Sequence, residues 1–203
     1  HNQSRRQRQM CIRDRSLDGK KIPISIIKRK NTPKNAPTLL YGYGSYGISI
    51  PPSFSASRLS LIDRGMVYAI AHIRGGMEKG KKWYEDGKKR KKLNSFNDFI
   101  SCAKFLKKEN ISGNISIHGG SAGGLLIGAS LNISPDTFHC AVAEVPFVDV
   151  LNTILDETLP LTPPEWEEWG NPIKNRSDYD YIRSYSPYDL SLIHISEPTR
   201  LRR

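Results

Sequence analysis

Residues 115–126 read ISIHGGSAGGLL, and they give the clearest indication of the fold. A β-branched run is followed by a serine among glycines and then by an apolar run, which is the order strand, tight turn, helix. Gly119, Ser121 and Gly123 fit the pattern G-x-S-x-G, in which the serine sits on a sharp strand-to-helix turn. The glycines lack the Cβ atoms that would keep strand and helix apart. The stretch therefore predicts Ser121 as a nucleophile, with the backbone amide of Ala122 facing a developing oxyanion at the positive helix N-terminus.

The surrounding sequence alternates between strand-like and helix-like segments. Apolar, β-branched runs predict strands at 22–28, from 38, at 66–73, at 115–118 and at 140–147, the last expected to be buried. Helical patterns are expected at 54–64, from Ser95 and at 122–132. Ser95 and Asp98 have the spacing of a capping box, which predicts that the helix starts there. The alternation predicts the α/β class, with a parallel sheet and helices on both faces.

A serine nucleophile needs a histidine base and a carboxylate that orients the base. On strand–elbow–helix folds their order along the chain is serine, acid, histidine. Only His139 and His194 follow Ser121. His139 is expected at the opposite edge of the sheet, and His118, on the strand before the serine, is expected to pack or hydrogen-bond locally. We therefore expect Ser121 to be the only member of its triad in this chain.

Both ends differ in character from the middle of the chain. Residues 1–15 are polar and aperiodic, and residues 191–203 begin with an abrupt change of pattern. Both resemble translated sequencing-adapter sequence, so we expect non-native tails at 1–15 and 191–203 and one partial domain at 16–190.

The composition excludes several classes of protein. No apolar run approaches the ~18 residues that span a bilayer, so no membrane partner is expected. The three cysteines show neither disulfide nor metal-ligand spacing, so we expect a cytoplasmic protein without a metal or other cofactor.

The formal net charge is +11, and residues 79–92, KGKKWYEDGKKRKK, hold eight of the basic residues. Such a run can bind a polyanion, but it is more often a solvated surface. Its two aromatic residues are adjacent rather than spaced as a stacking platform. We therefore expect no nucleic-acid partner and keep a polyanion-binding module as an alternative.

Seven motifs in order carry a resemblance to a family. They are YGYGSYG (41–47), SRLSLIDRG (57–65), AHIRGG (71–76), WYEDGK (83–88), GGSAGGLL (119–126), VPFVDV (145–150) and EEWGNP (167–172). Residues 16–190 resemble the oligopeptidase B branch of the prolyl oligopeptidase family of serine peptidases. The resemblance implies a cytoplasmic α/β-hydrolase domain, here incomplete, and in the full protein a β-propeller that is absent from this chain. It also implies that the triad Asp and His lie in a C-terminal segment beyond this chain.

The resemblance implies roles for particular residues. Ser121 matches the nucleophile, and Tyr43 matches a phenol that forms the oxyanion hole with the amide of Ala122. Glu165 and Glu167 match carboxylates that hold the basic residue before the scissile bond, and Phe147 matches an aromatic lining of that pocket. The resemblance thus implies an endopeptidase that cleaves short basic peptides after Arg or Lys through an acyl-enzyme.

Three further expectations follow. At 50–53 the sequence reads IPPS, where some family members have acidic residues for a second basic side chain, so a preference for paired basic residues is not implied. Without the triad Asp and His, the chain alone is expected to be inactive. An esterase or acyl hydrolase of the same fold stays a second alternative, because an elbow does not define the substrate.

Overall fold

The computed structural model describes residues 7–191 and places six strands in one sheet, in the order β1-β2-β4-β3-β5-β6. β1 and β2 are antiparallel, as are β2 and β4, whereas β4, β3, β5 and β6 run parallel. The predicted α/β class and the parallel sheet over the alternating segments are confirmed. The strands are β1 (Gln7–Arg15), β2 (Lys21–Arg29), β3 (Ala36–Tyr41), β4 (Val67–Ala71), β5 (Ser112–Gly120) and β6 (Cys140–Glu144).

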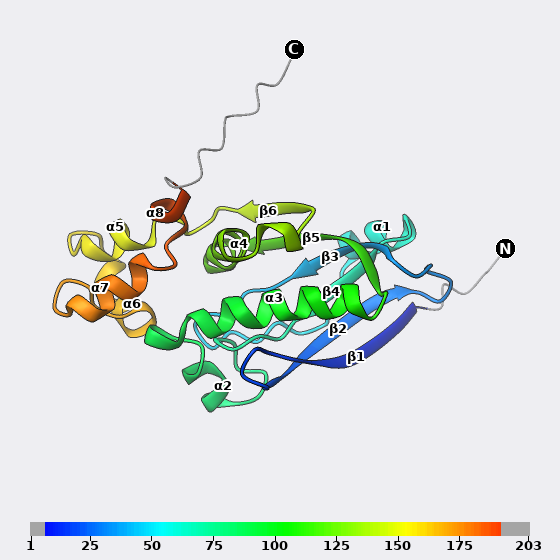
Figure 1. Cartoon of the computed structure of the whole chain (residues 1–203), viewed down its shortest axis with the longest axis horizontal. Coiled ribbons are helices and arrows are strands. Elements are labelled where there is room, and N and C mark those ends of the chain that lie inside the picture. Colours follow the sequence, from blue (N-terminus) through cyan, green and yellow to red (C-terminus); the bar gives the residue numbers. More distant parts are fainter. Residues whose placement is uncertain (1–6, 192–203) are drawn as a thin grey trace, which may run out of the picture.

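Figure 1 shows how the helices surround this sheet: α3 and α4 lie on one face, and α5 to α8 gather beyond the end toward which β3 and β6 point. Within the described residues, no helix combines the length and apolar character that a membrane crossing requires. The helices are α1 (Ala56–Asp63), α2 (Lys81–Glu85), α3 (Leu93–Lys108), α4 (Ala122–Ile133), α5 (Val150–Leu155), α6 (Thr162–Trp169), α7 (Arg176–Arg183) and α8 (Pro187–Ser191), with short 3₁₀ helices η1 (Lys89–Lys91) and η2 (Pro135–Thr137).

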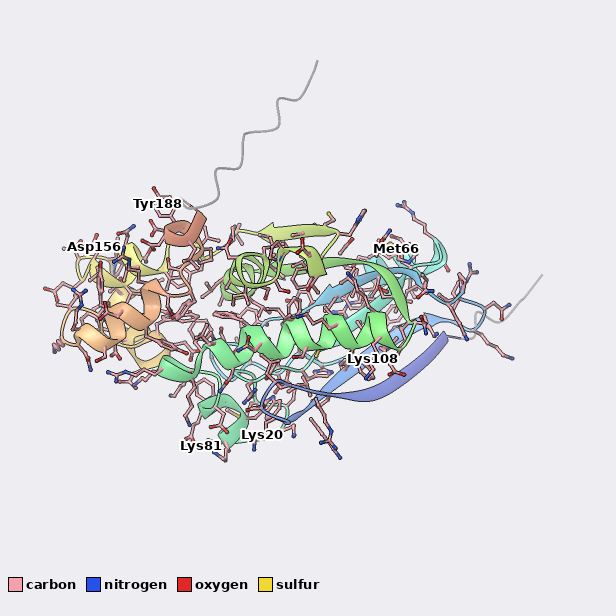
Figure 2. All side chains as sticks on the ribbon, in the orientation of Figure 1. Lys20, Met66, Lys81, Lys108, Asp156 and Tyr188 are labelled. Atoms are coloured by element: carbon pink, nitrogen blue, oxygen red, sulfur yellow. The ribbon has the colours of Figure 1, made fainter. Side chains whose placement is uncertain are left out.

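The strand β4 contributes side chains to two hydrophobic cores. Val67, Ala69 and Ala71 join the main core, while Tyr68 and Ile70 join a smaller core that includes Ile62 of α1. Successive side chains of a strand point to opposite faces, so a run buried on both sides marks a central strand covered by helices on both faces. Figure 2 shows side chains filling the space between α3 and the sheet, while exposed residues such as Lys81 and Asp156 lie at the periphery.

Residues 7–15, which the sequence analysis left out of the fold, form β1. Gln7 lies opposite Arg29 and Arg15 opposite Lys21, so the pairing with β2 covers the whole strand. Ladder hydrogen bonds use backbone groups, and so a polar, aperiodic stretch can pair without showing a strand pattern. The expectation that 1–15 and 191–203 are non-native stays a prediction, and residues 1–6 and 192–203 lie outside the described residues.

The expectation of a buried strand at 140–147 was wrong. The strand β6 stops at Glu144, and most of its residues are exposed, with Val142 49% exposed. The physical reason is its position: β6 is an edge strand and, within residues 7–191, pairs only with β5. Apolar sequence indicates a preference for burial, but a neighbouring element must supply the cover.

The predicted capping box of α3 was also wrong. The helix begins at Leu93, before Ser95, and has no side-chain cap. Ser95 Oγ instead donates to the carbonyl of Arg74 at 2.7 Å. Both carboxylate oxygens of Asp98 accept from the Arg74 guanidinium, at 2.6 and 2.8 Å. Both side chains are buried and bind another segment, so this tertiary contact replaces the local cap.

Candidate active site

Ser121 sits at the junction of β5 and α4 in a strained backbone conformation. Its φ is 53° and its ψ is −119°, a left-handed φ that is uncommon for a residue other than glycine. The Ser121 amide donates to the carbonyl of Glu144 at 2.9 Å, and the Ser121 carbonyl accepts from the amide of Phe147 at 3.0 Å. The backbone of Ser121 is thus bound to the end of β6 and to the segment that follows it, and Ser121 is exposed.

The glycines two positions before and two positions after the serine are closely packed. A Cβ at Gly119 would overlap the carbonyl oxygen of Gly123. A Cβ at Gly123 would lie 3.0 Å from the carbonyl oxygen of Gly42 and 3.2 Å from the ring of Tyr43. The predicted reason for these glycines, close approach of strand and helix, therefore holds. The approach also brings the segment after β3 against the start of α4.

Tyr43 lies two residues after the end of β3 and beside the elbow. Burial raises the pKa of its phenol, Tyr41 and Glu165 raise it further, and a hydrogen bond with the Ser121 side chain opposes this shift. The phenol therefore keeps its proton at neutral pH and can donate it. Ala122 is the first residue of α4, and no carbonyl among the described residues accepts a bond from its amide. Two hydrogen-bond donors, a phenol and a backbone amide, thus lie beside Ser121.

A pocket of about 370 Å³ opens next to Ser121. Glu165 of α6 supplies its carboxylate, and Phe147 supplies an aromatic wall. The structure therefore brings Ser121, Phe147 and Glu165 to one cavity, as the sequence analysis expected. The remaining lining residues, mostly apolar, are Tyr46, Thr153, Ile154, Leu159, Pro160, Leu161 and Thr162.

The carboxylate of Glu165 is held from one side. Its Oε2 accepts from Tyr46 Oη at 2.7 Å and from Trp169 Nε1 at 2.5 Å. Burial, followed by the contact with Glu165, raises the pKa of Tyr46, so its phenol remains a donor. Within the described residues Oε1 accepts no hydrogen bond. One oxygen therefore fixes the carboxylate, and the other is free to receive a ligand.

Glu167 is not part of this pocket. Its side chain is 84% exposed, and Oε2 pairs with Lys89 Nζ at 3.1 Å. Residues two apart on a helix point about 200° apart, so Glu165 and Glu167 face opposite sides of α6. The structure thus separates the two carboxylates that the sequence analysis placed together.

Sequence reasoning missed Glu168, which is 3% exposed. Its Oε2 accepts from Tyr84 Oη at 2.8 Å, and its Oε1 accepts from the amide of Tyr46 at 3.1 Å and lies 3.4 Å from Lys92 Nζ. Lysine and glutamate are almost never fully buried unless they are paired, as Lys92 and Glu168 are here. In the sequence this pair was hidden, because Lys92 ends a basic run and Glu168 belongs to an acidic one.

The described histidines lie elsewhere. His118 Nε2 is 3.2 Å from Glu144 Oε2, so its partner lies on the neighbouring strand β6 and not in its own segment. His139 is exposed, and its amide bonds the carbonyl of Ile115, far along β5 from the elbow. His72 is buried and bonds Ser25. Across residues 7–191 no histidine hydrogen-bonds Ser121, and His194 lies outside the described residues.

Comparison with known proteins gives the family. A family model described as the prolyl oligopeptidase family matches residues 52–199, well over half of the chain. The chain belongs to the prolyl oligopeptidase family. The resemblance seen in the seven motifs and the α/β-hydrolase fold that it implied are both confirmed.

The relatives within this prolyl oligopeptidase family are close in sequence and structure. The chain is 51% identical over 177 residues to "Dipeptidyl aminopeptidase BI" of Pseudoxanthomonas mexicana, covering 85% of this chain and 24% of the relative. It is 47% identical to "Protease 2" of Moraxella lacunata, covering 91% and 27%. Oligopeptidase B from Trypanosoma brucei with covalently bound antipain superposes with a TM-score of 0.87 at 50% identity, covering 90% and 26%. The chain thus spans about a quarter of the length of these prolyl oligopeptidase relatives.

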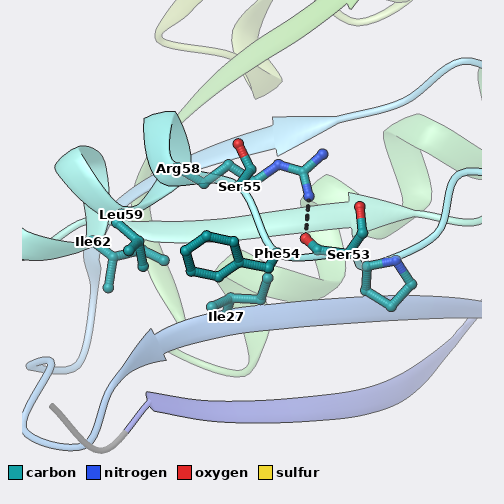
Figure 3. A pocket seen from close by; sticks show the side chains of 8 residues that line it. Ile27, Ser53, Phe54, Ser55, Arg58, Leu59 and Ile62 are labelled. Carbon is teal, nitrogen blue, oxygen red and sulfur yellow. Dashed lines mark hydrogen bonds between the residues drawn. The ribbon is translucent and has the colours of Figure 1, made fainter.

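A second pocket of this prolyl oligopeptidase segment, of about 300 Å³, lies away from Ser121. Figure 3 shows it between Ile27 of β2, the loop carrying Phe54, and Arg58 of α1, which donates to the carbonyl of Ser53 at 3.0 Å. Its described lining contains no carboxylate.

The basic run at 79–92 is partnered throughout. Ion pairs are typical contacts of this run. Asp86 pairs with both Lys82 and Lys91, and Arg90 pairs with Asp178. A polyanion would compete with these contacts. The other partners are Lys21 O and the Trp83 ring for Lys79, Glu85 for Lys81, Tyr84 for Lys88, Glu167 for Lys89 and Glu168 for Lys92.

Proposed function

We propose that this segment carries the nucleophile, the oxyanion donors and the basic-residue pocket of a serine peptidase that cleaves short peptides after Arg or Lys through an acyl-enzyme. The observation that carries the proposal is the shared pocket of Ser121, Phe147 and Glu165. Ser121 would attack the scissile carbonyl, while the Tyr43 phenol and the Ala122 amide would stabilise the oxyanion. The covalent antipain complex of the T. brucei relative supports a covalent route.

The pocket chemistry supports a basic residue before the scissile bond. A guanidinium entering the pocket would meet the free Oε1 of Glu165 and could pack on the Phe147 ring. Apolar walls would cover the aliphatic stem of Arg or Lys. The carboxylate is already fixed by Tyr46 and Trp169, so little ordering is lost when the ligand binds.

We propose that the base and its carboxylate come from outside residues 7–191, and that residues 1–203 alone do not turn over peptides. The described histidines support this, since none bonds Ser121. A benzyloxycarbonyl-Arg-Arg fluorogenic peptide tests it: the isolated chain should release no fluorophore, and rapid release would contradict the proposal.

Substrate class is tested in the full-length protein that the gene encodes. Replacing Glu165 by Gln should lower kcat/KM for the Arg peptide by about 10²-fold, because the guanidinium loses its charge partner in the pocket. Hydrolysis of p-nitrophenyl acetate should stay within twofold of wild type. Glu167→Gln, the same change on the opposite side of α6, is the matched control and should leave both activities unchanged. Equal loss of peptide and ester activity in Glu165→Gln would contradict the pocket assignment.

A second mode of peptide cleavage has an observation in its favour. The P. mexicana relative is named a dipeptidyl aminopeptidase, which suggests cleavage of a dipeptide from a free amino terminus. Comparing Gly-Arg and benzyloxycarbonyl-Gly-Arg fluorogenic substrates separates the two modes. An endopeptidase cleaves the blocked substrate, whereas a strict dipeptidyl peptidase requires the free amine.

A further inference from the structure

We propose that Lys92 is a positioning residue that joins the oxyanion-hole loop, which carries Tyr43, to the helix α6, which carries Glu165. The proposal rests on the proposed function, because that function gives Tyr43 and Glu165 their roles. Lys92 immediately precedes α3 and is not among the residues that line the pocket. It would act through the two segments that it connects.

On one side Lys92 holds the loop after Tyr43. Its Nζ donates to the carbonyl of Gly44 at 2.8 Å and to Ser45 Oγ at 2.6 Å. Gly44 has a φ of +71°, and a Cβ there would lie 2.6 Å from Ile73, so the loop fits tightly at this point. A shift of Gly44 would move its neighbour Tyr43, whose phenol must sit within hydrogen-bond distance of the oxyanion.

On the other side Lys92 contacts the last turn of α6. Its Nζ lies 3.4 Å from Glu168 Oε1 and 4.6 Å from the centroid of the Trp169 ring. Trp169 Nε1 in turn donates to Glu165 Oε2. The side chains that Lys92 contacts therefore include one that fixes the pocket carboxylate.

Packing alone does not account for a lysine at this place. Lys92 is 1% exposed, and burial lowers the pKa of its amine to about 8, with Glu168 opposing the shift. Burying an ammonium costs free energy that an apolar side chain of similar length would not incur. What the lysine adds is directional donors that reach the loop and the helix together. The charged amine therefore serves to position the loop and the helix, and not to raise the stability of the fold.

The test compares Lys92→Met with Lys91→Met in the full-length protein. Lys91 is the neighbouring lysine and pairs on the surface with Asp86, so its variant removes the same charge outside the connection. Active enzyme is counted by titration with a fluorophosphonate, so that a loss of folded protein does not lower the measured kcat. Substrates are the Arg peptide, which uses pocket and oxyanion hole, and p-nitrophenyl acetate, which uses the oxyanion hole alone.

For Lys92→Met we expect kcat per titrated site to fall about 10-fold or more on both substrates, since a displaced oxyanion donor weakens transition-state binding. KM for the Arg peptide should also rise, whereas Lys91→Met should match wild type. A kcat within twofold of wild type on both substrates would overturn the proposal. A failure of the proposed substrate class would look different, because the ester needs no basic pocket. In that case wild type would cleave the ester but not the Arg peptide.

A milder variant keeps the test decisive if Lys92→Met does not fold. Ser45→Ala removes one loop acceptor and leaves the buried ion pair intact. We expect kcat to fall about threefold on both substrates, about the loss of one modest hydrogen bond. An unchanged kcat in folded Ser45→Ala would contradict the inference that Lys92 fixes the loop.

Discussion

Tyr46 donates its phenol hydrogen to Glu165 across 2.7 Å, from the loop after β3 to the helix α6. The same ring meets Trp169 edge-on, with ring centroids 5.7 Å apart. Tyr46 itself has a left-handed φ of 58°, so this loop adopts an unusual conformation to reach the carboxylate. One tyrosine thus connects the loop of the oxyanion hole with the pocket that is proposed to select the substrate.

Replacing Tyr46 by Phe should weaken binding of basic substrates. The ring contacts stay, but one of the two donors that fix Glu165 is lost. Because hydrogen bonds to charged groups contribute about 1.5–3 kcal/mol, KM for the Arg peptide should rise roughly 10-fold. Steady-state kinetics in the full-length protein measure it, and hydrolysis of p-nitrophenyl acetate is the control. An unchanged KM would show that Trp169 alone positions the carboxylate.

Replacing Tyr43 by Phe should lower turnover instead. The variant removes the phenol donor beside Ser121 and leaves the pocket intact. Loss of one oxyanion-hole donor typically lowers kcat about 10²–10³-fold, and we expect the same for peptide and ester. KM for the Arg peptide should change little. A kcat equal to that of wild type would show that Tyr43 only packs in the structure. The Ala122 amide would then stabilise the oxyanion together with another donor.

The elbow glycines provide a stability test with a neighbouring control. Gly119→Ala would place a Cβ onto the carbonyl of Gly123, and backbone on both sides cannot move away. We expect unfolding to become easier by about 3 kcal/mol or more, at the upper end of overpacking costs. At Gly120 the nearest atom to an added Cβ is 3.4 Å away, so Gly120→Ala should be close to neutral. Urea unfolding measures both, and equal effects would contradict the packing argument.

Lys92 should give a pH dependence of stability with a defined sign. Its pKa is lowered by burial from 10.5 to about 8 in the folded protein. Below pH 8 the amine is charged in both states and contributes no slope. Between about pH 8 and 10.5 the unfolded chain binds more protons, so wild type should gain stability relative to Lys92→Met as pH rises. Urea unfolding at pH 7, 8, 9 and 10 measures this difference, and a fall across that range would exclude the lowered pKa.

The sequence predicted those features of the fold that depend on neighbouring residues. The elbow could be inferred because strand, turn and helix follow one another around Ser121. The positions of Phe147 and Glu165 came from the family resemblance, since nothing local distinguishes Glu165 from Glu167. Helix geometry separates them: two residues along α6 turn the side chain away from the pocket, so only one of the pair reaches it.

Other features depend on contacts between distant segments. Ser95 and Asp98 have the local pattern of a cap, but Arg74, 21 and 24 residues away, binds both. Lys92 looks like its neighbour Lys91 in sequence, yet one is buried and the other pairs at the surface. A basic run shows charge but not which member faces inward. Such differences follow from tertiary packing, which overrides local preference.

The exposed strand β6 has a consequence for handling the protein. Within the described residues, one side of its backbone ladder has no partner, and Val142 and Val145 are exposed, the latter at 81%. An open, apolar edge is a template on which a second chain can add a strand. At high concentration, isolated chains should therefore associate edge to edge, and a lysine in place of Val142 would act as a gatekeeper against it.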